Sequence, residues 1–168
     1  MKMNKLFFGE KRIHFGKLSD KLVGSDYRLR TYYYFSMPYQ SNPPTEEERR
    51  RYENTRRYLA SLERINRFEI RFGKLVKRRD DRGERFEQKG VDVLLSVDLV
   101  RMSFDHQIDA AVLLTGDSDF VPAVRAAKEA GVIVRLYYVP GNCGDDLITT
   151  CDESYEIDED LIRQVHLD

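Results

Sequence analysis

Asp109-Ala110-Ala111-Val112-Leu113-Leu114-Thr115-Gly116-Asp117-Ser118-Asp119-Phe120-Val121-Pro122 is the stretch that decides the fold. Its five apolar residues at 110–114 are too few for a helix and are closed by Thr-Gly, which predicts a buried parallel strand running into a tight turn. Small and apolar residues then recur at helical spacing over 120–130, and Pro122 suits the first turn of a helix. Asp117 and Asp119 are therefore expected at the carboxyl end of a strand, where open α/β sheets bind ligands.

Asp117 and Asp119 have two interpretations at this stage. Two carboxylates separated by one residue, between a strand end and a helix start, suit a divalent cation, which prefers oxygen ligands. Alternatively, one aspartate caps the helix and the other is a solvated turn residue. The residues of the turn alone leave both interpretations open.

Composition indicates a globular protein that folds as one domain, residues 1–168. Of the 168 residues 41% are hydrophobic and 34% are charged, which is typical of a folded chain rather than a disordered one. No apolar stretch reaches membrane-spanning length, and the first residues lack a signal-peptide pattern. Cys143 and Cys151 form neither a disulfide framework nor a zinc pattern, so we expect a reducing, cytoplasmic compartment.

The net charge of -1 conceals a strong asymmetry along the chain. Between Arg49 and Lys89 there are fifteen Lys and Arg residues against seven Asp and Glu residues, whereas from Pro140 onward nine acidic residues face only Arg163. Such a separation is typical of a protein with a phosphate-facing side. The simpler alternative is that the arginines lie on a solvated helix and maintain solubility.

The remaining pattern alternates strands and helices, which predicts an α/β protein with a mainly parallel sheet. A capping box, Thr45-Glu46-Glu47-Glu48, marks the start of the longest helix. The elements expected besides the strand 110–114 and its helix are a helix at 15–23, a strand at 27–35, a helix at 45–68, a strand at 69–77, an exposed mobile loop at 77–85, a helix at 92–104, a strand at 132–139, a short helix at 147–151, an edge strand at 155–157 and a terminal helix capped by Asp158.

Two further aspartates fall within the helix expected at 92–104. Asp92 stands where an N-cap belongs, and Asp98 is flanked by Val97 and Leu99. At about 100° per residue the two acids lie roughly 240° apart, so they do not share a helix face. We expect Asp98 to pair with Arg101 one turn on, in preference to a role in a site.

The chain resembles the NYN domain, the LabA-like branch of the PIN-like nuclease superfamily. The resemblance rests on three motifs, densest between Lys89 and Ile157, and the fold it implies is a three-layer Rossmann-like sandwich with a mainly parallel central sheet. It also implies acidic residues at the carboxyl edge of that sheet, Mg²⁺ or Mn²⁺ as cofactor, and hydrolysis of phosphodiester bonds in RNA. The motifs are Lys89-Gly90-Val91-Asp92 with Val97-Asp98, Thr115-Gly116-Asp117-Ser118-Asp119-Phe120, and Cys151-Asp152.

Carried over position by position, the resemblance implies that Asp92, Asp117 and Asp119 are the catalytic and metal-binding acids, with Asp98 as an additional metal candidate. Two cations about 4 Å apart can position a water and neutralise charge on the attacking and leaving oxygens. Thr115 and Ser118 would orient the acids or a phosphate. The other residues expected to bind RNA are Asn4, Lys89, Arg78, Arg79, Arg82 and Arg85.

The amino end departs from the family pattern. The family's first strand ends in an aspartate, but here Asn4-Lys5-Leu6-Phe7-Phe8-Gly9 resembles only the part after it, and no acidic residue precedes Glu10. The domain is therefore expected to be truncated at its amino end and to lack a central strand, a gap that neighbouring strands, a partner strand or a homodimer would have to close.

A metal-dependent ribonuclease is the predicted function. The alternative is a catalytically weak or inactive nucleic-acid-binding or regulatory domain that keeps the nuclease fold. A receiver-like signalling domain is a weaker third interpretation, because the sequence offers no clear phosphoacceptor.

Overall fold

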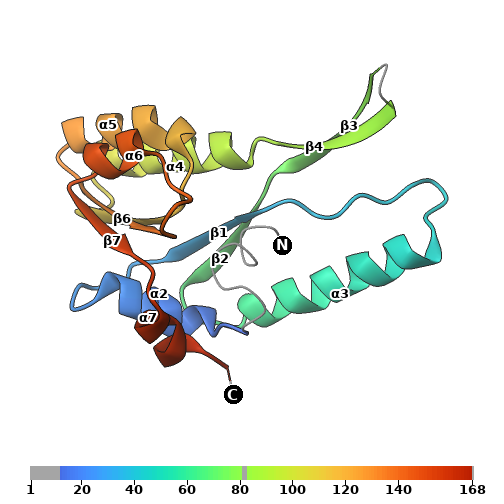
Figure 1. Cartoon of the computed structure of the whole chain (residues 1–168), viewed down its shortest axis with the longest axis horizontal. Coiled ribbons are helices and arrows are strands. Elements are labelled where there is room, and N and C mark those ends of the chain that lie inside the picture. Colours follow the sequence, from blue (N-terminus) through green and yellow to red (C-terminus); the bar gives the residue numbers. More distant parts are fainter. Residues whose placement is uncertain (1–11, 81–82, 168) are drawn as a thin grey trace. The chain divides into compact units, whose positions relative to one another are not determined.

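Residues 12–80 and 83–167 are described by the structure, a computed structural model, with the backbone alone for residues 74–80 and 83–89 (Figure 1). Helices and strands alternate through most of this range. In chain order the elements are α2 (Phe15–Val23), β1 (Thr31–Phe35), α3 (Glu46–Leu62), β2 (Phe68–Phe72), β3 (Lys74–Asp80), β4 (Gly83–Lys89), α4 (Val91–Phe104), β5 (Ala110–Leu114), the 3₁₀ turn η1 (Ser118–Phe120), α5 (Val121–Glu129), β6 (Ile133–Tyr138), α6 (Asp145–Thr150), β7 (Glu153–Glu156) and α7 (Glu159–Val165).

Contacts divide the chain into two compact units. One contains the residues through Leu29 together with those from Ser96 onward, and the other is Arg30–Leu95. We call them the C-terminal unit and the arginine-rich unit. Helix α4 begins in the second and ends in the first. The expected single domain stays a prediction.

A three-stranded parallel sheet, in the order β5-β6-β7, forms the centre of the C-terminal unit. Leu113 lies opposite Leu136, and Leu136 is completely buried. Helices α5 and α6 pack against each other and α5 packs on β6 (Figure 1), which supplies the apolar cover that a parallel sheet needs. The fully buried apolar side chains of this core are Val124, Ala127, Val134, Leu136, Leu147 and Val165.

The first and last described helices of the C-terminal unit lie together. Helix α2 contacts α7, and the His14 N–H donates to the Val165 carbonyl at 2.8 Å. The predicted cap of the terminal helix is confirmed, because the Asp158 carboxylate accepts the Leu161 N–H at 2.7 Å. The chain thus joins residues far apart in sequence into one core.

The arginine-rich unit is built on a two-stranded parallel pair, β1 and β2, in which Tyr33 lies opposite Ile70. Its long helix α3 begins with the predicted capping box, which is confirmed, since Thr45 and Glu48 cap each other's backbone N–H groups. Every residue of β1 is half-buried. This strand is therefore less enclosed than β5 and β6 of the C-terminal unit, which carry buried side chains.

Three predicted boundaries in the arginine-rich unit are wrong. The strand expected at 27–35 begins only at Thr31. Helix α3 ends at Leu62 rather than near Phe68, and the strand expected at 69–77 stops at Phe72. The exposed loop expected at 77–85 is also wrong, because residues 74–80 and 83–89 pair as the antiparallel strands β3 and β4. Strand pairing is made by backbone groups, so it does not require the apolar side chains whose absence suggested a loop.

The mixed α/β fold with parallel sheets is confirmed, and the strand predicted at 110–114 matches β5 at both ends. Gly131 follows α5 with a φ of 87°, the left-handed conformation expected of a residue that ends a helix. Among the described residues, no helix is both long enough and apolar enough to cross a membrane.

Candidate functional site

The loop after β5 is anchored before it reaches the two aspartates. Thr115 is 2% exposed, and its N–H donates to the Tyr137 carbonyl at 3.3 Å. The Thr115 hydroxyl accepts the Asp117 N–H at 3.2 Å. Thr115 therefore fixes the backbone of Asp117 and is too buried to contact a substrate directly.

Asp117 and Asp119 form a compact turn with exposed carboxylates. Asp117 is the N-cap of η1, and its Oδ1 accepts the Asp119 N–H at 3.0 Å. Both side chains are exposed to solvent. The capping interpretation is therefore confirmed for Asp117, but capping uses only Oδ1, so Oδ2 of Asp117 and the carboxylate of Asp119 remain available for a cation.

A second loop, between β6 and α6, lies directly against this turn. A Cβ atom on Gly116 would stand 1.9 Å from the Asn142 carbonyl oxygen, and one on Gly144 would stand 2.1 Å from Ser118 Oγ. Only glycine leaves room for this approach. The Ser118 hydroxyl donates to Asp146 Oδ1 at 2.5 Å, which joins the two loops.

The hydrogen bond from Ser118 lowers the pKa of Asp146 below its ordinary value, with the Leu147 N–H contributing as well. Asp146 is therefore ionised at neutral pH. Asp146 was not among the predicted site residues, because the acidic residues after Pro140 were interpreted only as a charge run. A usable signal was present, since Asp145-Asp146 follows the end of the strand next to β5.

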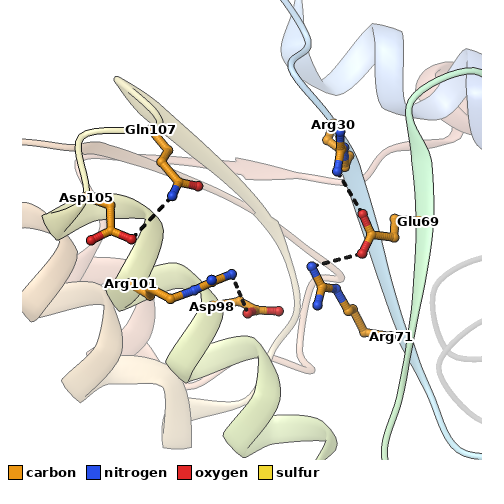
Figure 2. Close-up of polar contacts among 7 residues, drawn as sticks. All are labelled: Arg30, Glu69, Arg71, Asp98, Arg101, Asp105 and Gln107. Carbon is orange, nitrogen blue, oxygen red and sulfur yellow. Dashed lines mark hydrogen bonds and ion pairs between the residues drawn. The ribbon is translucent and has the colours of Figure 1, made fainter.

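Asp98 has the environment predicted for it. The side chain is 7% exposed, and Oδ1 lies 3.5 Å from Arg101 Nη2, one turn along α4 (Figure 2). The same figure shows Gln107 donating to Asp105. The predicted ion pair of Asp98 is thus confirmed.

Asp92 lies within the first turn of α4, so the prediction that it is the N-cap is wrong. Gly90 stands before the helix with a φ of 86°, and its carbonyl accepts the Leu94 N–H at 2.8 Å. An exposed acid at this place is favoured by the helix dipole. Asp92 belongs to the arginine-rich unit, and its convergence with Asp117 and Asp119 stays a prediction.

The expected RNA-binding residues stay predictions. Asn4 and Arg82 lie outside the described residues, and the others are on the β3–β4 hairpin, described by its backbone. In the same unit, Glu69 binds both Arg30 and Arg71 at 2.9 Å (Figure 2). The residues on the hairpin are Arg78, Arg79, Arg85 and Lys89.

The chemistry of the Asp117–Asp119 turn fits a hard cation. Mg²⁺ is commonly held by one or two carboxylates with water completing the shell, and Mn²⁺ accepts similar oxygen ligands. Within residues 12–80 and 83–167, no group of three or more His, Cys, Asp or Glu side chains is arranged to hold a metal ion. The turn therefore supplies a pair of carboxylates.

Asp152, which follows Cys151 in the third motif, connects neighbouring elements through its side chain. Its Oδ2 accepts the Val134 N–H at 2.8 Å, and its Oδ1 lies 3.1 Å from Lys128 Nζ. Lys128 also donates to the Thr150 carbonyl at 2.7 Å. Asp152 therefore ties the end of α6 to β6 and α5.

An α/β fold with a pair of exposed carboxylates after a strand of its parallel sheet agrees with one class of protein, the PIN-like nucleases. The NYN domain model matches residues 3–158, and the chain belongs to the NYN domain family. That family lies within the PIN-like nuclease superfamily.

Two individual proteins are similar to the chain. An uncharacterised protein of Methanocaldococcus jannaschii is 46% identical over 41 residues, which is 24% of this chain and 17% of that protein. The chain thus matches only a small part of that relative's length. A crystal structure of a Vibrio parahaemolyticus protein of unknown function superimposes with a TM-score of 0.67 at 19% identity, covering 98% of this chain and 91% of the other. This likeness confirms the fold.

Proposed function

We propose that the chain is a metal-dependent ribonuclease that hydrolyses RNA phosphodiester bonds with Mg²⁺ or Mn²⁺ held at the carboxyl end of β5. The observation that carries the proposal is the exposed Asp117–Asp119 turn, held by hydrogen bonds in a member of the NYN domain family. Asp117 and Asp119 would hold the ion, with Asp92 as third ligand. A divalent ion would activate water and neutralise charge on the phosphate oxygens.

The chain's own residues prepare this turn for the ion. Thr115 and the Asp119 N–H fix Asp117, so little conformational entropy is lost when its carboxylate binds. Asp98 is committed to Arg101, and we leave it outside the proposed ligand set. The arginines of the β3–β4 hairpin would attract the RNA backbone from a separate part of the chain.

The proposal is tested by Mn²⁺ calorimetry and by Mn²⁺-dependent cleavage of a single-stranded RNA. We expect Asp117→Asn and Asp119→Asn each to weaken Mn²⁺ binding and to abolish cleavage. Asp109→Asn is the matched control, because Asp109 is an exposed aspartate just before the opposite end of the same strand. Equal Mn²⁺ affinity in the parent and in Asp117→Asn would contradict the assignment.

The second candidate is a nucleic-acid-binding or regulatory domain without cleavage. It is favoured by the same finding that limits the metal site, namely that the described residues gather no group of three metal-binding side chains. RNA binding that is unaffected by EDTA, together with no cleavage in Mn²⁺, would establish this alternative. Sedimentation of the parent chain would show at the same time whether it forms the predicted homodimer.

A further inference from the structure

Asp146 is held more firmly than an ordinary surface aspartate. Its Oδ1 accepts both the Ser118 hydroxyl at 2.5 Å and the Leu147 N–H at 2.8 Å. Its backbone carbonyl accepts the Thr150 hydroxyl at 2.6 Å. One residue thus fixes the first turn of α6 and, through its side chain, contacts the loop after β5.

Ser118 links Asp146 to the turn that carries Asp117 and Asp119. It stands between Asp117 and Asp119 in sequence and is the first residue of η1. An O–H···O⁻ bond of this length is charge-assisted and is about twice as strong as a neutral one. Because η1 spans only three residues, fixing its first side chain restrains the direction of both neighbouring carboxylates.

The two glycines show that the contact depends on close fit. Gly144 leaves the space that Ser118 Oγ occupies, and Gly116 lets the Asn142 carbonyl approach the turn. A side chain at either place would push the loops apart. The Ser118–Asp146 bond therefore lies within a tight junction rather than on an open surface.

We propose that Asp146 is a positioning residue that, through Ser118, holds the turn of residues 115–119 in the conformation in which Asp117 and Asp119 bind a divalent ion. The ion-binding part of this inference rests on the proposed function. The loop-holding part concerns the metal-free chain and is judged separately.

Four variants separate positioning from direct metal ligation. Ser118→Ala and Asp146→Ala both break the bond, whereas Asp146→Asn keeps an oxygen that can accept it. Asp145→Ala is the matched control, because Asp145 is the adjacent exposed aspartate in the same turn of α6. Ser118→Ala removes one oxygen atom and is the variant least able to disturb folding.

Hydrogen exchange in the metal-free protein tests the loop-holding part. We expect the N–H groups of Asp117 and Asp119 to exchange about tenfold faster in Ser118→Ala and Asp146→Ala, as loss of one charge-assisted bond implies. Asp145→Ala and Asp146→Asn should stay within about threefold of the parent. Unchanged exchange in Ser118→Ala would overturn the proposal, whether or not the protein binds metal.

Mn²⁺ calorimetry tests the second part. Loss of an outer-shell partner typically lowers metal affinity by about 10–100-fold, and we expect this for Ser118→Ala and Asp146→Ala, with near-parental affinity in Asp146→Asn. The double variant, Ser118→Ala with Asp146→Ala, should bind Mn²⁺ no more weakly than either single variant, because both substitutions remove the same bond.

Two outcomes would contradict these expectations. If Asp146→Asn bound Mn²⁺ as weakly as Asp146→Ala while Ser118→Ala kept the parental affinity, Asp146 would be a metal ligand and the positioning role would be overturned. No Mn²⁺ binding by the parent would instead refute the proposed function, and exchange would still decide the loop-holding part.

Discussion

The two compact units use the same kind of parallel strand but enclose it to different degrees. In the C-terminal unit the middle strand β6 carries Val134 and Leu136, both with no exposed surface. In the arginine-rich unit β1 is half-buried throughout, and the buried apolar side chains among those described are Leu59, Leu62 and Phe68. The Asp117–Asp119 turn is thus built on the well-packed unit, while the hairpin arginines lie on the less enclosed one.

The difference in packing between the two units suits the chemistry expected of each. Metal ligands must be held to within a fraction of an ångström, so they benefit from a rigid core behind them. Contacts to a phosphate backbone are long-range and tolerate movement of the side chains that make them. We therefore expect stability to depend mainly on the C-terminal unit and RNA affinity mainly on the arginine-rich unit.

The strongest test of this comparison is a pair of core substitutions at matched strand positions. Leu136→Ala should lower the free energy of unfolding by about 2–5 kcal/mol, because the side chain is fully buried. Ile70→Ala, in the middle of the half-buried β2, should cost about half as much. Urea denaturation of both variants measures the two losses, and equal losses would show that the units are equally well packed.

A second test concerns the outer edge of β5. Among the described residues β5 pairs only with β6, and the Thr115 N–H points to the Tyr137 carbonyl. Peptide groups alternate along a strand, so those of residues 110, 112 and 114 face away from β6. Edge strands usually carry charged residues, and this one, Ala-Ala-Val-Leu-Leu, has none. The edge is therefore suited to a further strand.

We predict that an added strand of about ten residues, ending in Ile-Asp-Gly and fused ahead of Met1, pairs with this edge and brings an aspartate to its carboxyl end. Three new backbone bonds at about 1 kcal/mol each would raise the thermal midpoint by several degrees and increase Mn²⁺-dependent cleavage. A version of the extension with two prolines is the control, since proline cannot pair in a strand. Equal stability and activity with and without the added strand would refute the prediction that this edge accepts one.

The hairpin arginines provide a test in which stability should not change. Replacing Arg78, Arg79, Arg82 and Arg85 by Ala should weaken binding to any single-stranded RNA and reduce the salt slope by about 0.7 for each lost contact. The matched control replaces four exposed arginines on α3 or just after it and changes net charge equally. An unchanged slope in the hairpin variant would indicate that its arginines are only solvated. The control positions are Arg50, Arg56, Arg57 and Arg64.

Sequence patterns predicted the C-terminal unit well because its elements are defined locally. The apolar run of β5, the left-handed Gly131 and the Asp158 cap each carry their own signal. The β3–β4 hairpin was missed because its pairing relies on backbone bonds rather than on an apolar pattern. The bond of Asp146 to Ser118 was missed because it joins residues 28 positions apart. The sequence signals only that Asp145-Asp146 follows the strand next to β5.

The alkylation rates of the two cysteines test how often the core of the C-terminal unit opens to solvent. Burial raises the pKa of Cys151 to about 11, whereas the less buried Cys143 has a pKa that desolvation raises to a smaller extent. Only thiolate reacts with iodoacetamide, so at pH 8 about 0.1% of Cys151 is in the reactive form while the residue stays buried. We expect Cys143 to be alkylated at least tenfold faster, as followed by mass spectrometry. Similar rates would mean that the unit opens readily.

The smallest expected effect lies at the start of α3, in the arginine-rich unit. Hydrogen bonds from the Ser41 hydroxyl and the Thr45 N–H lower the pKa of Glu48 from 4.5 to about 2. Because the folded pKa is lower than the unfolded one, the stabilisation is fully present above about pH 4.5 and is lost as the pH falls toward 2. The parent should therefore melt at a higher temperature than Glu48→Gln at pH 6, and the difference in melting temperature should disappear between pH 4.5 and 2.

Glu47→Gln, in the same turn, controls for the general effect of an acid near the helix start. A difference between parent and Glu48→Gln that stays constant down to pH 2 would show that the capping bonds do not depend on the charge of Glu48.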